Sequence, residues 1–63
     1  MDADSNHPQL MNARQVAALL LMRESTVQDY ARRGVLPSIK LGRHRRFVRT
    51  DVLAAVEQLR HPA

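Results

Sequence analysis

The most informative part of the chain is residues 32–49, RRGVLPSIKLGRHRRFVR, which hold seven basic side chains and no acidic one. Polar and apolar residues alternate over 38–41, and Arg46-Phe47-Val48 follows with two apolar residues, so the pattern predicts the two strands of a β-hairpin. The turn is expected to run from Gly42 to His44 or Arg45, and its length decides which arginine faces the core, a choice that the sequence leaves open. A folded hairpin with this many cations is suited to a polyphosphate, and DNA is the commonest such partner of a small basic domain.

Upstream of the hairpin, Asn12 and Gln15 have the spacing of a capping box at a helix N-terminus. Apolar residues then recur at helical spacing, so we expect a helix over 13–20. A turn should follow at 21–23, although no glycine or proline marks it. From this part of the chain alone, one continuous helix to Arg33 remains an open alternative.

A second helix is expected over 24–33, with Ser25 and Thr26 as its start signal. Gly34 should end it, because glycine adopts the left-handed conformation after a helix at little steric cost. Pro37 prevents any continuation of the helix, since proline has no backbone N–H to donate. The two short, closely linked helices are typical of a helix-turn-helix.

A third helix should run from Thr50, as its N-cap, to about Arg60. Its expected apolar stripe consists of Val52, Leu53, Val56 and Leu59. Residues 1–9 are expected to form a disordered N-terminal tail and 61–63 a C-terminal tail, so the domain spans 10–60. The predicted fold class is mainly α with a small β-hairpin: a winged helix-turn-helix with a two-stranded wing and a C-terminal helix.

Length and composition fit one small domain of 63 residues with a net charge of +4 and no cysteine. The absence of cysteine excludes disulfides and cysteine zinc sites and fits a reducing compartment. The longest apolar run, 16–22, falls far short of the roughly 20 residues that span a bilayer. We therefore expect a soluble, intracellular protein that does not enter a membrane.

An enzyme, a cofactor and a metal site are not expected. No serine or threonine has a plausible His/Asp arrangement, and there is neither a glycine-rich phosphate loop nor a pair of carboxylates at catalytic spacing. His7, His44 and His61 are too scattered for a metal site. Tyr30 and Phe47 are the only aromatic residues. Both fall at core positions, which argues against a stacking surface for RNA or single strands.

The second helix should present six polar side chains to the major groove of DNA. They are Ser25, Thr26, Gln28, Asp29, Arg32 and Arg33. Glutamine can read adenine with two hydrogen bonds, and arginine can read guanine or contact phosphate. Asp29 either accepts a hydrogen bond from cytosine or orients an arginine. An ordinary solvated helix face is the alternative, and the adjoining basic hairpin favours DNA over it.

The wing supplies the second set of candidate contacts. It consists of Lys40, Arg43, His44, Arg45 and Arg46. A hairpin tip is narrow enough to approach a minor groove, and the negative potential of narrow A·T-rich grooves attracts arginine. A loop with randomly placed charges is the alternative, but a continuous run of cations argues against it.

The ordered set of motifs resembles the excisionase family, small winged helix-turn-helix proteins related to the DNA-binding domain of MerR-type regulators. The matching motifs are Val16-Ala17-Ala18-Leu19-Leu20, Ser25-Thr26-Val27, Arg33-Gly34-Val35-Leu36-Pro37, Lys40-Leu41-Gly42-Arg43, Arg46-Phe47 and Asp51-Val52-Leu53. Together they cover about Leu10 to Leu59. Two departures stand out: Leu21-Met22-Arg23 replaces the frequent Gly-Val-Ser turn, and Asp29 stands where the family commonly has arginine.

The resemblance implies an architectural protein that binds repeated sites beside an attachment site, bends DNA and directs an integrase toward excision. Its partners would be double-stranded DNA, an integrase and further copies of itself on adjacent sites. The resemblance also implies a cytoplasmic, nucleoid-associated protein of a bacterial cell or a phage-infected host. By the same resemblance, Arg43 would lead the wing into the minor groove, with Arg45 nearby. A small MerR-like transcriptional regulator and a protein-interaction module for an acidic partner are the alternatives.

Overall fold

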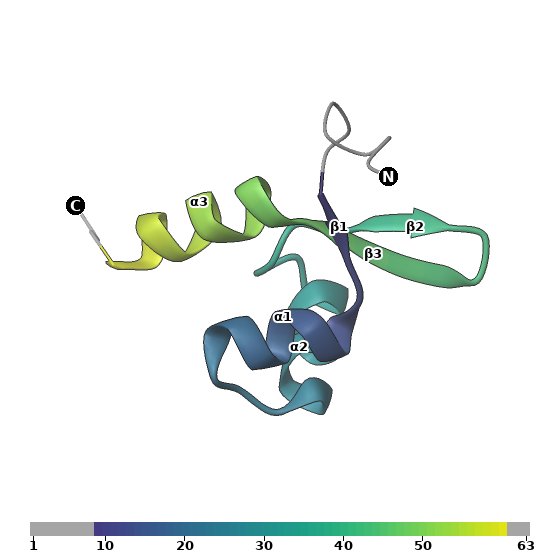
Figure 1. Ribbon diagram of the computed structural model, residues 1–63, viewed down its shortest axis with the longest axis horizontal. Helices are drawn as coiled ribbons and strands as arrows, with labels where there is room; N and C mark the ends of the chain where they lie inside the picture. Colours follow the sequence, from purple (N-terminus) through teal and green to yellow (C-terminus); the bar gives the residue numbers. More distant parts are fainter. Residues whose placement is uncertain (1–8, 61–63) are drawn as a thin grey trace, which may run out of the picture.

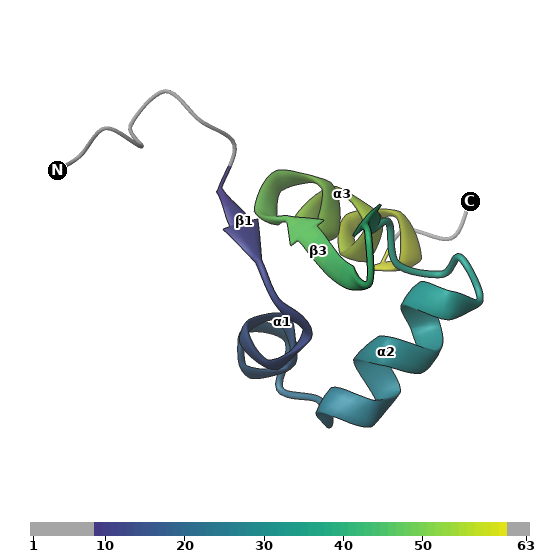
Figure 2. The same ribbon diagram turned by 90° about the vertical axis from the view of Figure 1, so that its right-hand side faces the viewer.

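The computed structural model describes residues 9–60, so the expected tails lie outside the described residues apart from Gln9. The helices are α1 (Ala13–Leu20), α2 (Glu24–Arg32) and α3 (Arg49–Arg60), and the strands are β1 (Leu10–Met11), β2 (Ile39–Leu41) and β3 (His44–Val48). One layer consists of α1 and α2, and the other of the sheet and α3 (Figure 1). Figure 2 shows α1 end-on while α2 runs across the view, so the two helices cross steeply. The fold is the predicted winged helix-turn-helix.

The first helix begins as its capping signal predicts. The Gln15 backbone N–H donates to Asn12 Oδ1, and the Asn12 N–H donates to Gln15 Oε1, both at 2.8 Å. This reciprocal pair satisfies two backbone donors that have no partner inside the helix. The predicted range 13–20 is confirmed.

The helix ends at a turn that the sequence marks poorly. Leu21 follows it with φ 57°, the left-handed region. The Leu21 N–H donates to Ala18 O at 3.4 Å and the Met22 N–H to Ala17 O at 2.9 Å, the hydrogen-bond pattern of a Schellman motif. One continuous helix to Arg33, the alternative left open above, is therefore wrong.

The second helix begins at Glu24, the first residue of the predicted range, but Ser25 and Thr26 do not provide its N-cap. Arg23 is the N-cap, and its side chain makes no capping hydrogen bond. Ser25 and Thr26 therefore lie within the first turn, and their prediction as the helix start is wrong. The C-terminal prediction is confirmed, because Gly34 has φ 80° and follows directly on the last turn of the helix.

The sheet has three antiparallel strands in the order β1-β3-β2, so the predicted two-stranded wing is incomplete. The additional strand, β1, pairs Leu10 with Val48 and Met11 with Phe47. Gln9 O accepts a further hydrogen bond from the Arg49 N–H at 3.0 Å. A strand of two residues is too short to show alternation, so nothing in the local sequence marks it.

The hairpin turn between β2 and β3 is shorter than expected. Leu41 pairs with His44, so only Gly42 and Arg43 form the turn, and β3 begins two residues before the predicted strand over 46–48. Gly42 has φ 64° at the first central position, where two-residue turns of type II′ have glycine. This settles the register, since residues two apart on a strand share a face: Arg45 lies on the side of Phe47.

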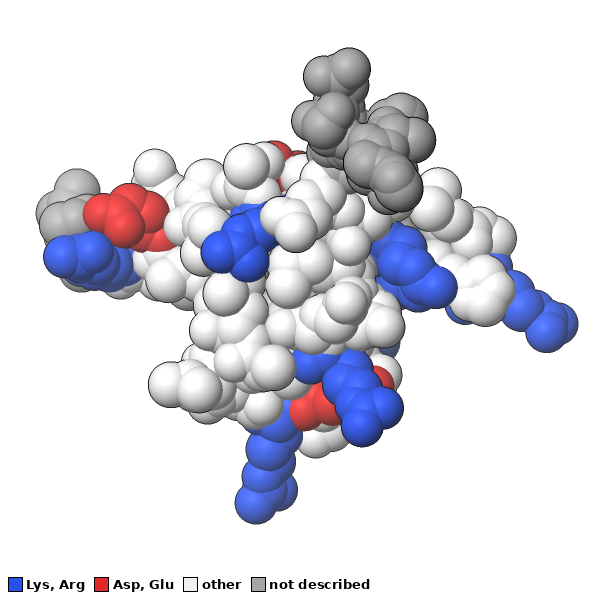
Figure 3. Space-filling model, viewed as in Figure 1, with Lys and Arg blue, Asp and Glu red and all other residues white. Residues whose placement is uncertain are grey.

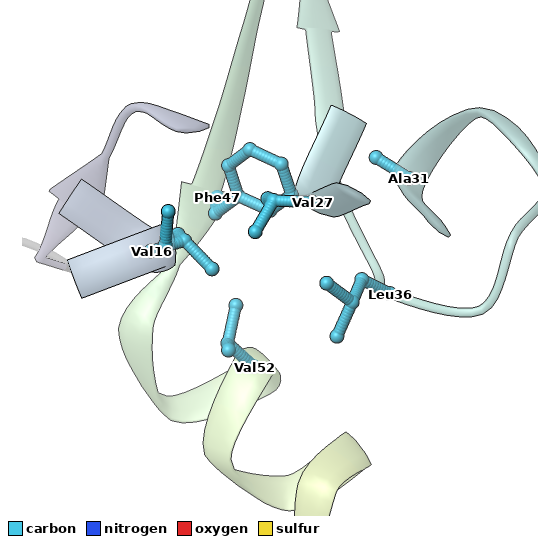
Figure 4. Close-up of a cluster of buried hydrophobic side chains, with 7 residues drawn as sticks. Val16, Val27, Ala31, Leu36, Phe47 and Val52 are labelled. Atoms are coloured by element: carbon cyan, nitrogen blue, oxygen red, sulfur yellow. The ribbon is translucent and has the colours of Figure 1, made fainter. Parts of the chain in front are cut away.

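The core lies between the two layers (Figure 4). Its buried side chains are Val16, Ala17, Val27, Ala31, Leu36, Phe47 and Val52. Phe47 is fully buried, and Figure 4 shows it beside Val27, with Val16 and Val52 nearby. Since all three helices and β3 contribute to this cluster, the core fixes the position of α2 relative to the wing.

Two expectations about the third helix need correction. The helix begins at Arg49, directly after β3, so Thr50 lies inside the first turn and is not its N-cap. Of the predicted stripe only Val52 is buried, whereas Leu53 and Leu59 are 40% and 63% exposed. For Leu59 the reason is that the far end of α3 extends beyond the α1–α2 layer (Figure 1), whereas Leu53 lies about 100° around the helix from the buried Val52.

Candidate nucleic-acid interface

An open groove of about 500 Å³ lies between α2, the start of α1 and the wing, which is the hairpin of β2 and β3. Its lining residues are Asn12, Ala13, Arg14, Glu24, Gln28, Arg32, Arg43, His44, Arg45 and Arg46. Five arginines and one glutamate give the groove a strongly positive potential. Such a groove attracts a chain of phosphates more than a neutral ligand.

The groove brings together some of the predicted contact residues and leaves out the others. Those that line it are Gln28, Arg32, Arg43, His44, Arg45 and Arg46. Those that do not are Ser25, Thr26, Asp29, Arg33 and Lys40. Helical geometry explains the division within α2, because residues four apart lie on one flank: Glu24, Gln28 and Arg32 face the wing.

Arg14 also lines the groove, and the sequence analysis missed it. It is exposed in the first turn of α1, a turn that contains no acidic residue. A cation at a helix N-terminus is unfavourable, because it meets the positive end of the helix dipole. This unfavourable placement could have identified Arg14 from the sequence, because a cation that does not stabilise its own helix is a candidate for a role in binding.

Polar side chains on α2 form hydrogen bonds and ion pairs with one another, both on the flank that faces the groove and on the outer face of the helix. Gln28 Nε2 donates to Glu24 Oε2 at 3.4 Å. Asp29 accepts from two arginines at once: Oδ1 lies 2.7 Å from Arg32 Nη2, and Oδ2 lies 2.7 Å from Arg33 Nη1. The two carboxylates of α2 thus organise the donors around them.

The pKa of the Asp29 carboxyl lies below its ordinary value, chiefly because Arg33 donates a hydrogen bond to it, and partial burial opposes this effect. The nearby charges of Arg33 and Arg32 and the Arg32 hydrogen bond lower the pKa further. In turn, the Asp29 hydrogen bond raises the pKa of Arg33. Asp29 is therefore ionised at neutral pH, and it offsets part of the positive charge of α2.

The wing cations have a different arrangement. Arg43 occupies the turn and is exposed, while Arg45 Nη1 donates to Ser38 Oγ at 2.8 Å and Arg46 Nη1 to the Arg45 carbonyl at 2.9 Å. Lys40 is directly opposite Arg45 in the register. Over residues 9–60, no carboxylate forms an ion pair with any of these cations. No carboxylate of the described residues therefore neutralises these wing cations.

Figure 3 shows the same contrast over the surface. Basic side chains project from the wing on the right and from the α1–α2 layer below, and acidic atoms appear among the lower group. The wing is thus a surface of uncompensated positive charge, and α2 is a surface of mixed charge. This division suits two kinds of contact, phosphate attraction by the wing and directional hydrogen bonding by α2.

The steeply crossed helices and the wing, with a basic groove between them, define a winged helix-turn-helix domain. The chain belongs to the helix-turn-helix domain family, whose model matches residues 10–60. This membership indicates that the protein binds DNA. A search of curated proteins and a search of solved structures each gave no significant match. None of the described helices is long and apolar enough to cross a membrane.

Proposed function

We propose that the protein is a sequence-specific, architectural DNA-binding protein that acts by binding and not by catalysis. The observation that carries the proposal is the groove between α2 and the wing, with its five arginines. In duplex DNA a phosphodiester strand separates each major groove from the next minor groove. The groove of the protein would hold that strand, with α2 in the major groove and the wing in the minor groove.

The chemistry of each element supports this division of labour. Gln28 and Arg32, on the flank of α2 that faces the wing, are suited to read adenine and guanine in the major groove. Arg43, at the tip of the two-residue turn, is suited to a narrow minor groove. The half-buried Arg45 and the exposed Arg14 would contact the phosphates between them.

The proposed biological role is that of an excisionase, which binds repeated sites beside an attachment site, bends DNA and directs an integrase in the cytoplasm. The motifs shared with that family support it. The size of the domain also supports it, since a single module buries only about 600–1,000 Å² on DNA. Further copies on adjacent sites would supply the affinity that one copy lacks.

Titration of duplex DNA at several salt concentrations tests the core of the proposal. If about five cations contact phosphates, the slope of log K against log salt is about −4.5, a loss of roughly 500-fold between 50 and 200 mM. The absence of binding in dilute buffer would refute DNA binding and leave an acidic protein partner. Footprinting and bending assays across an attachment region then test the role: a single unbent site at a promoter would favour the transcriptional regulator.

A further inference from the structure

The outer face of α2 carries one carboxylate between two arginines. With 3.6 residues per turn, Asp29 lies opposite the buried Val27 and Ala31, with Arg32 on the flank toward the wing and Arg33 on the other flank. Each oxygen of the carboxylate holds one guanidinium at 2.7 Å. The side chain of Asp29 is 37% exposed and those of the arginines are 67% and 60% exposed, so the trio is accessible to DNA.

Arg32 and Arg33 have different surroundings. Arg33 also lies over the ring of Tyr30, with its Cζ atom 5.8 Å from the ring centroid, and it does not line the groove. Arg32 lines the groove and has Asp29 as its ion-pair partner. The carboxylate therefore holds Arg33 against the body of the domain and leaves Arg32 on the side that faces the wing.

We propose that Asp29 is a positioning residue that determines sequence specificity: it fixes Arg32 for bidentate contact with a guanine and lowers the attraction of α2 for phosphates. This inference rests on the proposed function. An arginine that is free to rotate contacts phosphates on any sequence, whereas one held by a carboxylate presents its two donors in a fixed direction. A bidentate contact discriminates against the wrong base by roughly 5- to 150-fold.

The test compares affinities for two duplexes, the tightest one that the wild-type protein selects from a random pool and a scrambled duplex of equal length. The Asp29→Asn variant should bind the scrambled duplex more tightly, with a salt slope steeper by about 0.9. It should also lose roughly 10-fold of the specificity ratio between the duplexes, within the range of one lost bidentate contact. Glu57→Gln is the matched control, because it removes a carboxylate that pairs with an arginine three residues on, in α3. This control should leave the specificity ratio unchanged.

A double-mutant cycle isolates the route through Arg32. If Asp29 acts through that arginine, Asp29→Asn has no effect on the specificity ratio in an Arg32→Ala background. Arg32→Lys, which keeps the charge and loses the bidentate geometry, should lower the ratio as Asp29→Asn does. Replacing the contacted guanine by 7-deazaguanine should weaken binding of the wild type and not of Arg32→Ala.

The possible failures are distinguishable. An unchanged ratio with equally tighter binding to both duplexes would overturn the inference, because Asp29 would then merely repel phosphates. An effect that persists in the Arg32→Ala background would also overturn it, because Asp29 would then contact a base itself. In both cases the wild-type protein still binds DNA, so the proposed function stands. If the wild type binds neither duplex, both the function and the inference are wrong.

Discussion

Leu21 and Gly34 occupy equivalent places after the two helices of the helix-turn-helix. Both have a left-handed backbone, with φ 57° and 80°. After α1 the next N–H, that of Met22, donates to the carbonyl five residues back at 2.9 Å, and after α2 the N–H of Val35 does the same at 2.8 Å. The same motif is therefore built once on glycine, which adopts it freely, and once on leucine, which does not.

Replacing Leu21 by glycine should stabilise the domain. A left-handed residue with a side chain costs roughly 1–2 kcal/mol, and the greater freedom of glycine in the unfolded chain offsets part of the gain. Because the Leu21 side chain is 92% exposed, little packing is lost. We expect a gain of about 0.5–1 kcal/mol in the free energy of unfolding, measured by thermal denaturation. Leu21→Ala, which keeps the Cβ atom, should not give this gain; equal effects of both changes would contradict the argument.

The reciprocal change, Gly34→Ala, should destabilise the domain by roughly 0.5–1 kcal/mol, because the smaller freedom of alanine in the unfolded chain offsets part of the cost of a left-handed side chain. A Cβ atom at Gly34 would meet no atom within 4 Å, so the loss comes from the backbone conformation alone. Gly34→Asn should lose less, since asparagine tolerates the left-handed region better than alanine. A loss that is the same for both variants would point to a steric cause that the structure does not contain.

Local signals account for the parts of the fold that the sequence predicts well. The capping pair Asn12 and Gln15 and the glycine at 34 act through neighbouring backbone groups, so a few residues suffice to recognise them. The strand β1 is different, because its two residues are held by pairing with Val48 and Phe47, far along the chain. Leu21 is different again, because it adopts a left-handed conformation that its residue type disfavours, so its residue type gives no signal for the turn.

In the candidate site, too, local sequence patterns identify single residues but not the contacts between distant parts of the chain. Residue types and helical spacing identified Gln28 and Arg32, and the charge run identified the wing. The groove itself depends on how α2 faces β3 across the core, which no local pattern contains. Arg14 lies far from the basic run in sequence and joins the wing only in three dimensions.

The lowered pKa of Asp29 predicts an acid-sensitive contribution to stability. A carboxyl group whose pKa is lower in the folded than in the unfolded chain stabilises the fold at pH values above its unfolded-state pKa. This stabilisation is lost as the pH falls through its folded-state pKa. For Asp29 the ordinary value is 3.8, so the contribution is complete at neutral pH and is lost in acid below that value. The wild type should therefore lose its advantage in Tm over Asp29→Asn as the pH falls, and at low pH the difference in Tm should no longer depend on pH.

The control for this titration is Arg33→Gln, which removes the largest cause of the lowered pKa. In that background the pH dependence of the difference should be weaker, because only Arg32 still pairs with the carboxylate. A difference in Tm that stays the same at every pH would show that Asp29 has the same pKa in the folded and unfolded chains.

Arg14→Ala should weaken DNA binding without destabilising the fold. Loss of one phosphate contact weakens binding alike on all sequences and makes the salt slope shallower by about 0.9. The fold should be unchanged or gain up to about 1 kcal/mol, because the cation no longer opposes the dipole of α1. Arg60→Ala removes an arginine from the last turn of α3, outside the groove, and should leave DNA affinity unchanged. Equal losses of affinity for both variants would mean that net charge alone matters.

Arg43→Ala and Gln28→Ala should separate the wing from α2. Loss of Arg43 from the hairpin tip should weaken binding mostly on sites whose minor groove is narrow and A·T-rich, because that groove has the strongest negative potential. Gln28→Ala should change which sequences the protein binds, since it removes about 1–3 kcal/mol of discrimination at one base pair. Selection from a random duplex pool, followed by titration of the selected sites, measures both effects. Losses of equal size on every sequence for both variants would refute the assignment of shape reading to the wing and base reading to α2.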